Sequence, residues 1–329
     1  MGKQIAVIGA GAWGSTIAKV VAGNGHQVRL WCYLEEEVSS INQATALRLP
    51  GIQLPKGIQA SQDLNEVLVG ADYCIVALSS TQLDLLLTVD KDVFKETPII
   101  VLTKGFLDIP GEFFVVDYLK RVLSTDQVMI LSGPNLALEI AREKIAASVI
   151  ASEKTDLLLP VQELLSNHYF RVYGSSDVKG VALGGVLKNV VAIAAGLCDG
   201  LEMGTNAKSA LLARGLQEMC KIGDVLGANR ETFFGLSGLG DLVTTCSSSL
   251  SRNWQFGEQL SKGRKASEII SSLQQVTEGV RTSKVVSELI KTHQLELPIM
   301  SGIYQIIYEE AEPKDVLYGL MTRTLKLES

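Results

Sequence analysis

Two lysines in this sequence lie at positions where a charged side chain suggests a chemical role. Lys188 interrupts the apolar stretch 178–200, a predicted long buried helix, and Gly184 shares its helix face. Lys104 follows a predicted strand, within Thr103-Lys104-Gly105. An ammonium so placed can stabilise negative charge on an oxygen and transfer a proton, help worth about 10²–10⁴-fold in rate. The alternatives are a lysine that snorkels to water from a frayed first turn, for Lys188, and an ordinary loop, for Lys104.

A second polar group lies farther along the chain and suits a phosphate. Asp241 stands in the stretch 236–246, which is predicted to be a glycine-rich loop. Ser251, Arg252 and Asn253 then open a predicted helix. A helix N-terminus offers N–H groups, and a guanidinium can bind phosphate through two parallel hydrogen bonds. Ordinary N-capping would account for Ser251 but not for the Arg-Asn pair.

The N-terminal stretch has the pattern of a dinucleotide-binding turn. Strand Gln4–Ile8 is followed by the glycine turn Gly9–Gly14, a helix from about Ser15 to Asn24, and a second strand, Gln27–Trp31. In this motif the three glycines give a tight turn, a close approach of the backbone to pyrophosphate, and close helix packing. The complete context makes a purely structural turn the weaker interpretation.

The end of the second strand leaves the choice between NAD and NADP open. An acidic residue there usually binds the ribose 2′-hydroxyl, and an arginine accommodates a 2′-phosphate. This chain has Cys32-Tyr33, and Tyr33 could stack on adenine or only end the strand. The acidic run Glu35–Glu37 is more typical of a helix start, where carboxylates suit the helix dipole.

Strands alternate with helical or turn-like segments through the first half, which is typical of a doubly wound, mainly parallel α/β sheet. Ligands of such sheets bind outside the carboxyl ends of the strands. The polar segments at those ends should therefore face the same crevice as the glycine turn, and they are Ser79–Thr81, Thr103–Gly105 and Ser132–Asn135. The remaining predicted strands are Tyr73–Leu78, Ile99–Leu102, Val128–Leu131, Ala146–Ile150 and Tyr169–Val172.

The second half is predicted to be all-helical. The strand signals fade near residues 174–179, so we expect a Rossmann-like dinucleotide-binding domain, 1–176, and a helical substrate-binding and catalytic domain, 177–329, with the ligand between them. The expected helices are Val178–Leu201, Lys208–Leu226, Glu231–Phe234, Arg252–Lys262, Lys265–Ser272, Gly279–Lys291, Ile299–Glu309 and Pro313–Leu320.

Composition limits the other roles of the chain. A length of 329 residues suggests about two domains, and a net charge of −6 without a basic run argues against nucleic acid as a partner. Five cysteines and three histidines are scattered without metal-ligand spacing, so no metal site is expected. The apolar run broken by Lys188 is judged too short to cross a bilayer. We expect no signal peptide, and a reducing cytoplasm as the setting.

These motifs resemble the bacterial-type NAD(P)-dependent glycerol-3-phosphate dehydrogenases over nearly the whole chain. The resemblance rests on separate stretches in the same order, which are Gly9–Gly14, Thr103–Gly105, Ser132–Pro134, Gly184–Asn189, Gly196–Gly200, Gly238–Leu242, Ser251–Asn253 and Thr277–Gly279. It implies the reversible reduction of dihydroxyacetone phosphate by NADH or NADPH to sn-glycerol 3-phosphate. It also implies a cytoplasmic homodimer that serves glycerophospholipid synthesis.

The same resemblance implies roles for individual residues. Lys188 would be the catalytic acid/base, with Lys104 and Asp241 as its catalytic partners. The substrate site would be lined by Lys104, Gly133, Asn135, Lys188, Asn189, Asp241, Thr245, Ser251, Arg252 and Asn253. The cofactor would lie along Gly9, Gly11, Ala12, Trp13, Gly14, Tyr33, Lys104, Ala137, Arg252, Val276 and Glu278.

The chain departs from the family pattern at a few positions. Ala12 and Asn135 stand where the family more often has a hydroxyl residue, and Ser79 replaces a frequent proline. Tyr33 stands where arginine or histidine is common, which keeps the choice between NAD and NADP open. None of these departures removes a group that the chemistry requires.

Two alternatives remain from the residues alone. A dehydrogenase of the 6-phosphogluconate or 3-hydroxyacid type would share the glycine turn and a helical lysine, but would not explain the Arg-Asn pair after Gly-Leu-Gly-Asp. A non-catalytic dinucleotide sensor would bind cofactor without turnover. It would leave Lys104, Lys188 and Asp241 unexplained, because charged groups that gather in one crevice usually serve chemistry.

Overall fold

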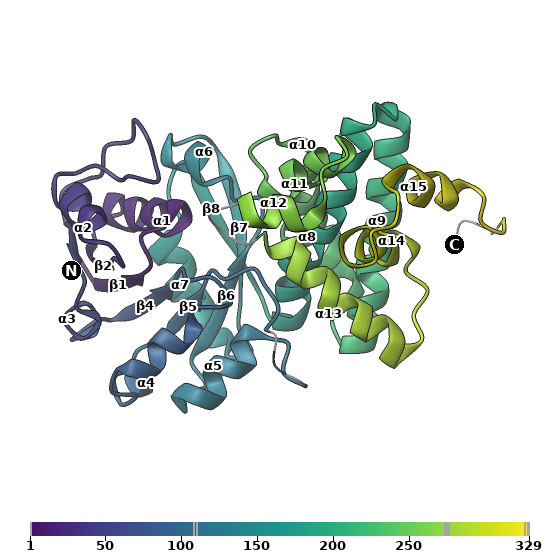
Figure 1. The fold of residues 1–329 in the computed structure, drawn as a ribbon. Helices are drawn as coiled ribbons and strands as arrows, with labels where there is room; N and C mark the ends of the chain where they lie inside the picture. The colour runs from purple at the N-terminus through teal and green to yellow at the C-terminus, as the bar shows by residue number, and fades with distance from the viewer. Residues whose placement is uncertain (1, 108, 110, 273–276, 326, 328–329) are drawn as a thin grey trace. The chain divides into compact units, whose positions relative to one another are not determined.

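The chain forms two compact units, Met1–Ala182 and Leu183–Ser329, in a computed structural model that describes residues 2–107, 109, 111–272, 277–325 and 327 (Figure 1). The first unit is an α/β structure built on a mainly parallel sheet, and the second is helical throughout its described residues. The fold class expected from the sequence is therefore confirmed.

The sheet of the first unit has the strand order β3-β2-β1-β4-β5-β6-β7-β8. Neighbouring strands are parallel except β6 and β7, which run antiparallel. The strand order changes direction between β1 and β4, and ligands of doubly wound sheets bind at such a point. The strands are β1 (Gln4–Ile8), β2 (Gln27–Trp31), β3 (Ile58–Ser61), β4 (Tyr73–Val76), β5 (Ile99–Val101), β6 (Val128–Ser132), β7 (Ala146–Ala151) and β8 (Phe170–Ser175).

Helices cover both faces of this sheet, which is why its central strands are apolar along their whole length. In Figure 1, α1 and α6 lie on one side of the sheet and α4 and α5 lie on the other. Every residue of β4 is buried. The helices are α1 (Ala12–Gly23), α2 (Glu35–Asn42), α3 (Leu64–Leu68), η1 (Leu83–Thr88), α4 (Val93–Glu96), α5 (Val115–Leu123), α6 (Ala137–Ala141), η2 (Thr155–Leu157) and α7 (Leu158–Leu165).

The second unit is built around α8 (Val178–Gly200), within which the boundary between the units falls. The other helices are α9 (Gly204–Leu226), η3 (Arg230–Phe234), η4 (Leu236–Gly240), α10 (Asp241–Ser247), α11 (Arg252–Ser261), α12 (Ala266–Ser272), α13 (Glu278–His293), α14 (Pro298–Tyr308) and α15 (Pro313–Met321). The expected helices follow α8 in the predicted order, and η4 and α10 are additional.

Two predictions about this unit were wrong. The stretch 236–246 is not a loop: η4 is a π-helical turn that runs directly into α10. Helix α8 is also long and apolar enough to cross a membrane despite Lys188, by length and composition only. Its apolar window is 100% buried inside the structure, as in the core helix of a soluble protein.

Glycines bring α11 into backbone contact with α8. A Cβ at Gly196 in α8 would lie 2.0 Å from Trp254 O, and a Cβ at Gly257 in α11 would lie 2.0 Å from Ile193 O. No real Cβ atom tolerates such a distance, so both positions require glycine for this close approach. The contact fixes the helix that begins with Arg252 against the helix that carries Lys188.

Candidate functional site

The glycine turn between β1 and α1 has the geometry of a pyrophosphate site. Gly9 has a φ of +112°, and a Cβ at Gly14 would lie 1.9 Å from Gly9 O. A Cβ at Gly11 would meet nothing within 4 Å, so the backbone there lies open to a ligand. The N-terminus of α1 adds N–H groups and the positive end of its dipole. The residues present therefore fit a dinucleotide.

Other predicted cofactor residues lie around this turn. Trp13 packs edge-on against Phe170, and its indole Nε1 is buried with no hydrogen-bond partner within the described structure. Buried donors are nearly always paired, so this one suits a ligand acceptor. Ala137 begins α6, where its carbonyl oxygen accepts a hydrogen bond of 3.1 Å from Thr16 Oγ1. Tyr33 is 71% exposed at the end of β2, so its ring does not act as a buried cap on the strand.

The polar segments after β4, β5 and β6 lie along the same sheet edge as the glycine turn, because these strands and β1 are adjacent and parallel. Lys104 Nζ donates a hydrogen bond of 2.8 Å to Gly133 O. Thr103 Oγ1 donates one of 2.8 Å to Leu78 O, which ties two strand ends together. The structure therefore brings Lys104 and Gly133 together, as the sequence predicted for residues after these strands.

In the second unit, Lys188, Asp241 and Thr245 form a buried group that we term the lysine cluster. Lys188 is 6% exposed and Asp241 is 1% exposed, and their side chains form an ion pair. Lys188 Nζ also donates to Thr245 Oγ1 over 2.6 Å, and Thr245 Oγ1 donates to Asp241 Oδ1 over 3.2 Å. A lysine at a frayed helix end is excluded, because Lys188 lies buried in the middle of α8.

Gly184 explains how Asp241 reaches Lys188. A Cβ at Gly184 would lie 2.5 Å from Ser237 O, so its absence lets η4 pack directly on α8. Lys188 lies one helical turn farther along the same face. Asp241 follows η4 at once and therefore meets the ammonium. The glycine that the sequence marked for a close approach accommodates another segment of this chain.

The lysine cluster contains a buried ion pair that is largely shielded from water. Burial of a single charge is costly, whereas a hydrogen-bonded pair of opposite charges is tolerated. Cys246, the neighbour of Thr245, is fully buried, and burial raises the pKa of its thiol to about 12. The Cys246 thiol is therefore protonated and unreactive. The Lys188 ammonium is the group here that can take part in acid–base chemistry.

The predicted phosphate residues lie at the N-terminus of α11. Ser251 caps this helix by accepting from Trp254 N over 3.3 Å, and Arg252 is exposed on the first turn. Asn253 Nδ2 donates to Asn189 Oδ1, and Asn253 Oδ1 accepts from Gly279 N, both over 2.9 Å. The two asparagine amides predicted to bind substrate are thus bonded to each other.

The cofactor residues predicted near α13 are described only in part. Glu278 is the first residue of this helix, and Val276 lies outside the described residues. Thr277 stands at the N-cap position, and its Oγ1 is buried without a hydrogen-bond partner in the described structure.

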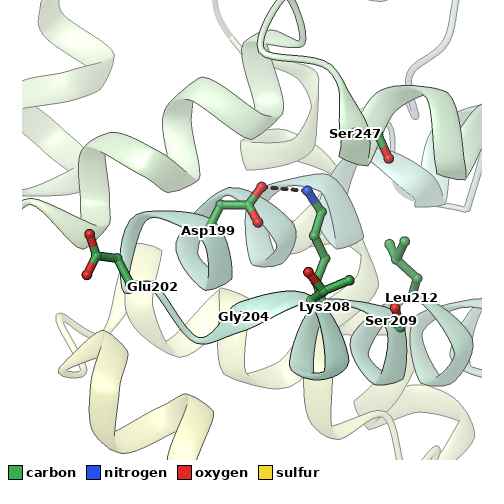
Figure 2. Close-up of a pocket in the computed structure, with 8 residues that line it drawn as sticks. Asp199, Glu202, Gly204, Lys208, Ser209, Leu212 and Ser247 are labelled. Carbon is green, nitrogen blue, oxygen red and sulfur yellow. Dashed lines mark hydrogen bonds and ion pairs between the residues drawn. The ribbon is translucent and has the colours of Figure 1, made fainter.

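A cavity of about 560 Å³ opens elsewhere in the second unit (Figure 2). Lys208 Nζ pairs with Asp199 Oδ2 over 2.5 Å, and Trp254 Nε1 donates to the same oxygen over 2.7 Å. With Glu202 also in the wall, carboxylates outnumber ammonium groups, so the cavity does not suit a phosphate. None of its lining residues was predicted to bind a ligand, and they are Asp199, Glu202, Gly204, Thr205, Lys208, Ser209, Leu212 and Ser247.

Sequence reasoning missed two buried residues with specific partners. Ser148 Oγ, in β7, donates to Asn135 Oδ1. The Glu218 carboxylate, in α9, accepts from Ile299 N over 2.8 Å and from Met300 N over 2.9 Å, and burial raises its pKa to about 7. Neither has a local sequence signal, because each partner is distant along the chain. Among the described residues, no group of three or more His, Cys, Asp or Glu side chains could hold a metal ion.

Comparisons with known proteins agree with this geometry. Residues 4–158 match the family model of the NAD-dependent glycerol-3-phosphate dehydrogenase N-terminus, and residues 177–318 match that of the C-terminus. A glycerol-3-phosphate dehydrogenase [NAD(P)+] from Syntrophotalea carbinolica is 41% identical over 99% of this chain and 99% of its own. One from Citrifermentans bemidjiense is 39% identical over 100% of this chain and 99% of its own.

A solved structure supports the same assignment. The crystal structure of glycerol-3-phosphate dehydrogenase from Coxiella burnetii is 34% identical, with a TM-score of 0.90 over 98% of this chain and 99% of that chain. Sequence and fold agree over nearly the full length. The chain therefore belongs to the NAD(P)-dependent glycerol-3-phosphate dehydrogenase family.

Proposed function

We propose that this chain catalyses reversible hydride transfer between NAD(P)H and dihydroxyacetone phosphate, forming sn-glycerol 3-phosphate, with Lys188 as the general acid/base. The observation that carries the proposal is the buried lysine cluster and its link to Arg252. Asn189 and Asn253, which are sequence neighbours of Lys188 and Arg252, are bonded over 2.9 Å. This hydrogen bond joins the segment that carries the proposed proton donor, Lys188, to the segment that carries the proposed phosphate-binding cation, Arg252. Relatives named for glycerol 3-phosphate support the substrate.

The chemistry requires a proton donor where negative charge develops. Reduction of the ketone leaves negative charge on its oxygen, which the Lys188 ammonium stabilises and protonates. Asp241 and Thr245 orient that ammonium through the hydrogen bonds described above. Arg252 and the N-terminus of α11 hold the substrate phosphate, which positions the carbonyl for reaction. In the first unit, Lys104 contributes a second positive charge to the reaction.

The first unit supplies most of the proposed cofactor site. We propose that Gly9, Gly11 and Gly14 accommodate the pyrophosphate, and that Trp13 and Ala137 lie along the dinucleotide. When bound, the nicotinamide supplies or accepts the hydride. Glu278, at the start of α13, and Arg252 complete the proposed contacts. The Tyr33 side chain places no charge at the end of β2, so this position is compatible with either NAD or NADP.

The wider setting is proposed on the same grounds. Residues 1–176 would form the dinucleotide-binding domain and residues 177–329 the catalytic domain. The product is the backbone of glycerophospholipids, so the enzyme would serve their synthesis. A cytoplasmic homodimer is the form that the family resemblance implies.

The direct test follows oxidation of NADH and of NADPH with dihydroxyacetone phosphate, each cofactor separately. We expect turnover with at least one of them, and the reverse reaction with glycerol 3-phosphate. A parallel panel of 6-phosphogluconate, 2-hydroxy acids and 3-hydroxy acids should give none. Turnover only with a member of that panel would support the related dehydrogenase class. Cofactor binding without any turnover would support a sensor.

A further inference from the structure

Two buried polar atoms at the carboxyl end of β6 lack partners in the described structure. They are Ser132 Oγ and Asn135 Nδ2. Nearly all buried polar atoms in folded proteins are hydrogen-bonded, so each unpaired one calls for an explanation. The ammonium of Lys104 is bonded beside them, to Gly133 O at 2.8 Å. Donors that gather at a strand end of a doubly wound sheet suit an acceptor oxygen of a ligand.

Ser148 determines which side of the Asn135 amide is left for that ligand. Its hydroxyl donates to Asn135 Oδ1 from β7, and the Ser148 side chain is 0% exposed. The amide oxygen is therefore occupied within the protein. The amide nitrogen, which can only donate, remains for a partner outside this pair.

We propose that Ser148 is a positioning residue that holds the Asn135 amide so that Nδ2 donates to an acceptor oxygen of the substrate, either carbonyl or phosphoryl. This inference rests on the proposed function and deepens it. A serine or threonine hydroxyl at position 135 could donate or accept, whereas the fixed amide can only donate. The positive charge of Lys104 favours an oxygen that is negative or becomes negative.

The test measures binding in complexes that cannot react. Dihydroxyacetone phosphate is titrated calorimetrically into the full chain with saturating oxidised cofactor, and glycerol 3-phosphate into the full chain with reduced cofactor. Asn135→Asp replaces the donor by an acceptor of equal size, and we expect at least tenfold weaker binding of dihydroxyacetone phosphate. Ser148→Ala frees the amide, and we expect binding about three- to tenfold weaker. A loss confined to the ketone identifies its carbonyl as the acceptor, and an equal loss for both ligands identifies the phosphoryl group.

A double-variant cycle separates positioning from general damage. With Asn135→Ala already present, Ser148→Ala should weaken binding no further, because the amide that it orients is gone. Ser152→Ala is the matched control, since Ser152 is buried just after the same strand and its hydroxyl accepts a hydrogen bond of 3.1 Å from the nearby Lys154 N. Binding of the dinucleotide, followed by fluorescence, should stay unchanged in all variants. Additive losses from Ser148→Ala and Asn135→Ala, or an effect of Ser152→Ala equal to that of Ser148→Ala, would overturn the positioning role.

The outcomes also distinguish this inference from the proposed function. If the unaltered chain binds and reduces dihydroxyacetone phosphate but Asn135→Asp and Ser148→Ala bind it normally, only the inference fails. If the unaltered chain neither binds nor reduces it, the proposed function fails, and the inference fails with it.

Discussion

At the scale of single residues, environment decides which charged groups serve chemistry. Arg252 is exposed at the start of α11, whereas Lys188 is buried against Asp241. A guanidinium at a helix N-terminus can bind a phosphate dianion through two charge-assisted hydrogen bonds, each worth about 1.5–3 kcal/mol. Truncation of such a side chain should therefore affect the binding of the phosphorylated substrate more than the chemical step.

We expect Arg252→Ala to raise the KM for dihydroxyacetone phosphate about 10- to 100-fold, with a smaller effect on kcat. Arg252→Lys should recover only part of this loss, because lysine keeps the charge but not the planar fork. Lys262→Ala, at the other end of the same helix, is the control and should behave as the unaltered chain does. Steady-state kinetics over a range of substrate concentrations check this, and an unchanged KM for Arg252→Ala would refute the phosphate role.

Single residues of the site were predictable from sequence to the extent that their signal is local. The glycine turn and Lys104 carry such signals, because strand, turn and helix context surrounds them. The bond of Asn253 to Asn189 and that of Ser148 to Asn135 join positions 64 and 13 residues apart. No spacing rule gives such pairs, since they depend on how the elements pack.

At the scale of elements, the contact between α8 and α11 depends on the absence of side chains. In Gly196→Ala, the intrinsic helix gain of about 1 kcal/mol would be outweighed, because the new Cβ would overlap backbone atoms of Trp254. We expect a loss of about 2 kcal/mol or more in the free energy of unfolding, measured by chemical denaturation. Gly319→Ala in α15 is the control, since its Cβ would meet nothing within 4 Å, and it should be neutral or stabilising. Equal effects of the two substitutions would contradict the packing argument.

Glu218 makes the junction of α9 with the N-terminus of α14 sensitive to pH. Its pKa rises from an ordinary value of 4.5 to about 7, chiefly through burial, although two backbone N–H groups oppose the change. A carboxyl with a raised pKa holds its proton more tightly in the folded state. Its contribution to stability is therefore complete below about pH 4.5 and is lost as the pH rises through about 7, at about 1.4 kcal/mol for each pH unit between the two values.

Comparison with Glu218→Gln isolates this effect. The free energy of unfolding of the unaltered chain should fall relative to that of Glu218→Gln between pH 5 and pH 8. Denaturation curves for both proteins at several pH values measure the difference. A difference that does not change with pH would show that the carboxyl keeps an ordinary pKa.

Elements were predicted well where the local sequence signal is strong and poorly where packing decides. Strands β1 and β2 have the predicted bounds, and the apolar stretch 178–200 forms a helix, α8, as predicted. Strand β3 was missed because its four residues, Ile-Gln-Ala-Ser, have little apolar character. The stretch 236–246 was predicted as a loop from its glycines, but Gly184 lets α8 hold it in helical form, so tertiary contact overrides local propensity.

At the scale of the whole molecule, the proposed function gives the two units separate parts in the reaction. The glycine turn that fits the cofactor belongs to the first unit, and the lysine cluster belongs to the second. The glycine turn and the lysine cluster each rest on contacts within their own unit, so loss of the Lys188 ammonium should leave the glycine turn intact. We expect Lys188→Ala to lower kcat at least 100-fold while the dissociation constant of the cofactor changes less than twofold. Fluorescence titration with the reduced cofactor and single-turnover kinetics provide the two readouts, and Lys221→Ala, which removes an exposed lysine of α9, is the control. Near-normal turnover of Lys188→Ala would refute the acid/base assignment, and a parallel loss of cofactor affinity would show that the two units do not act independently.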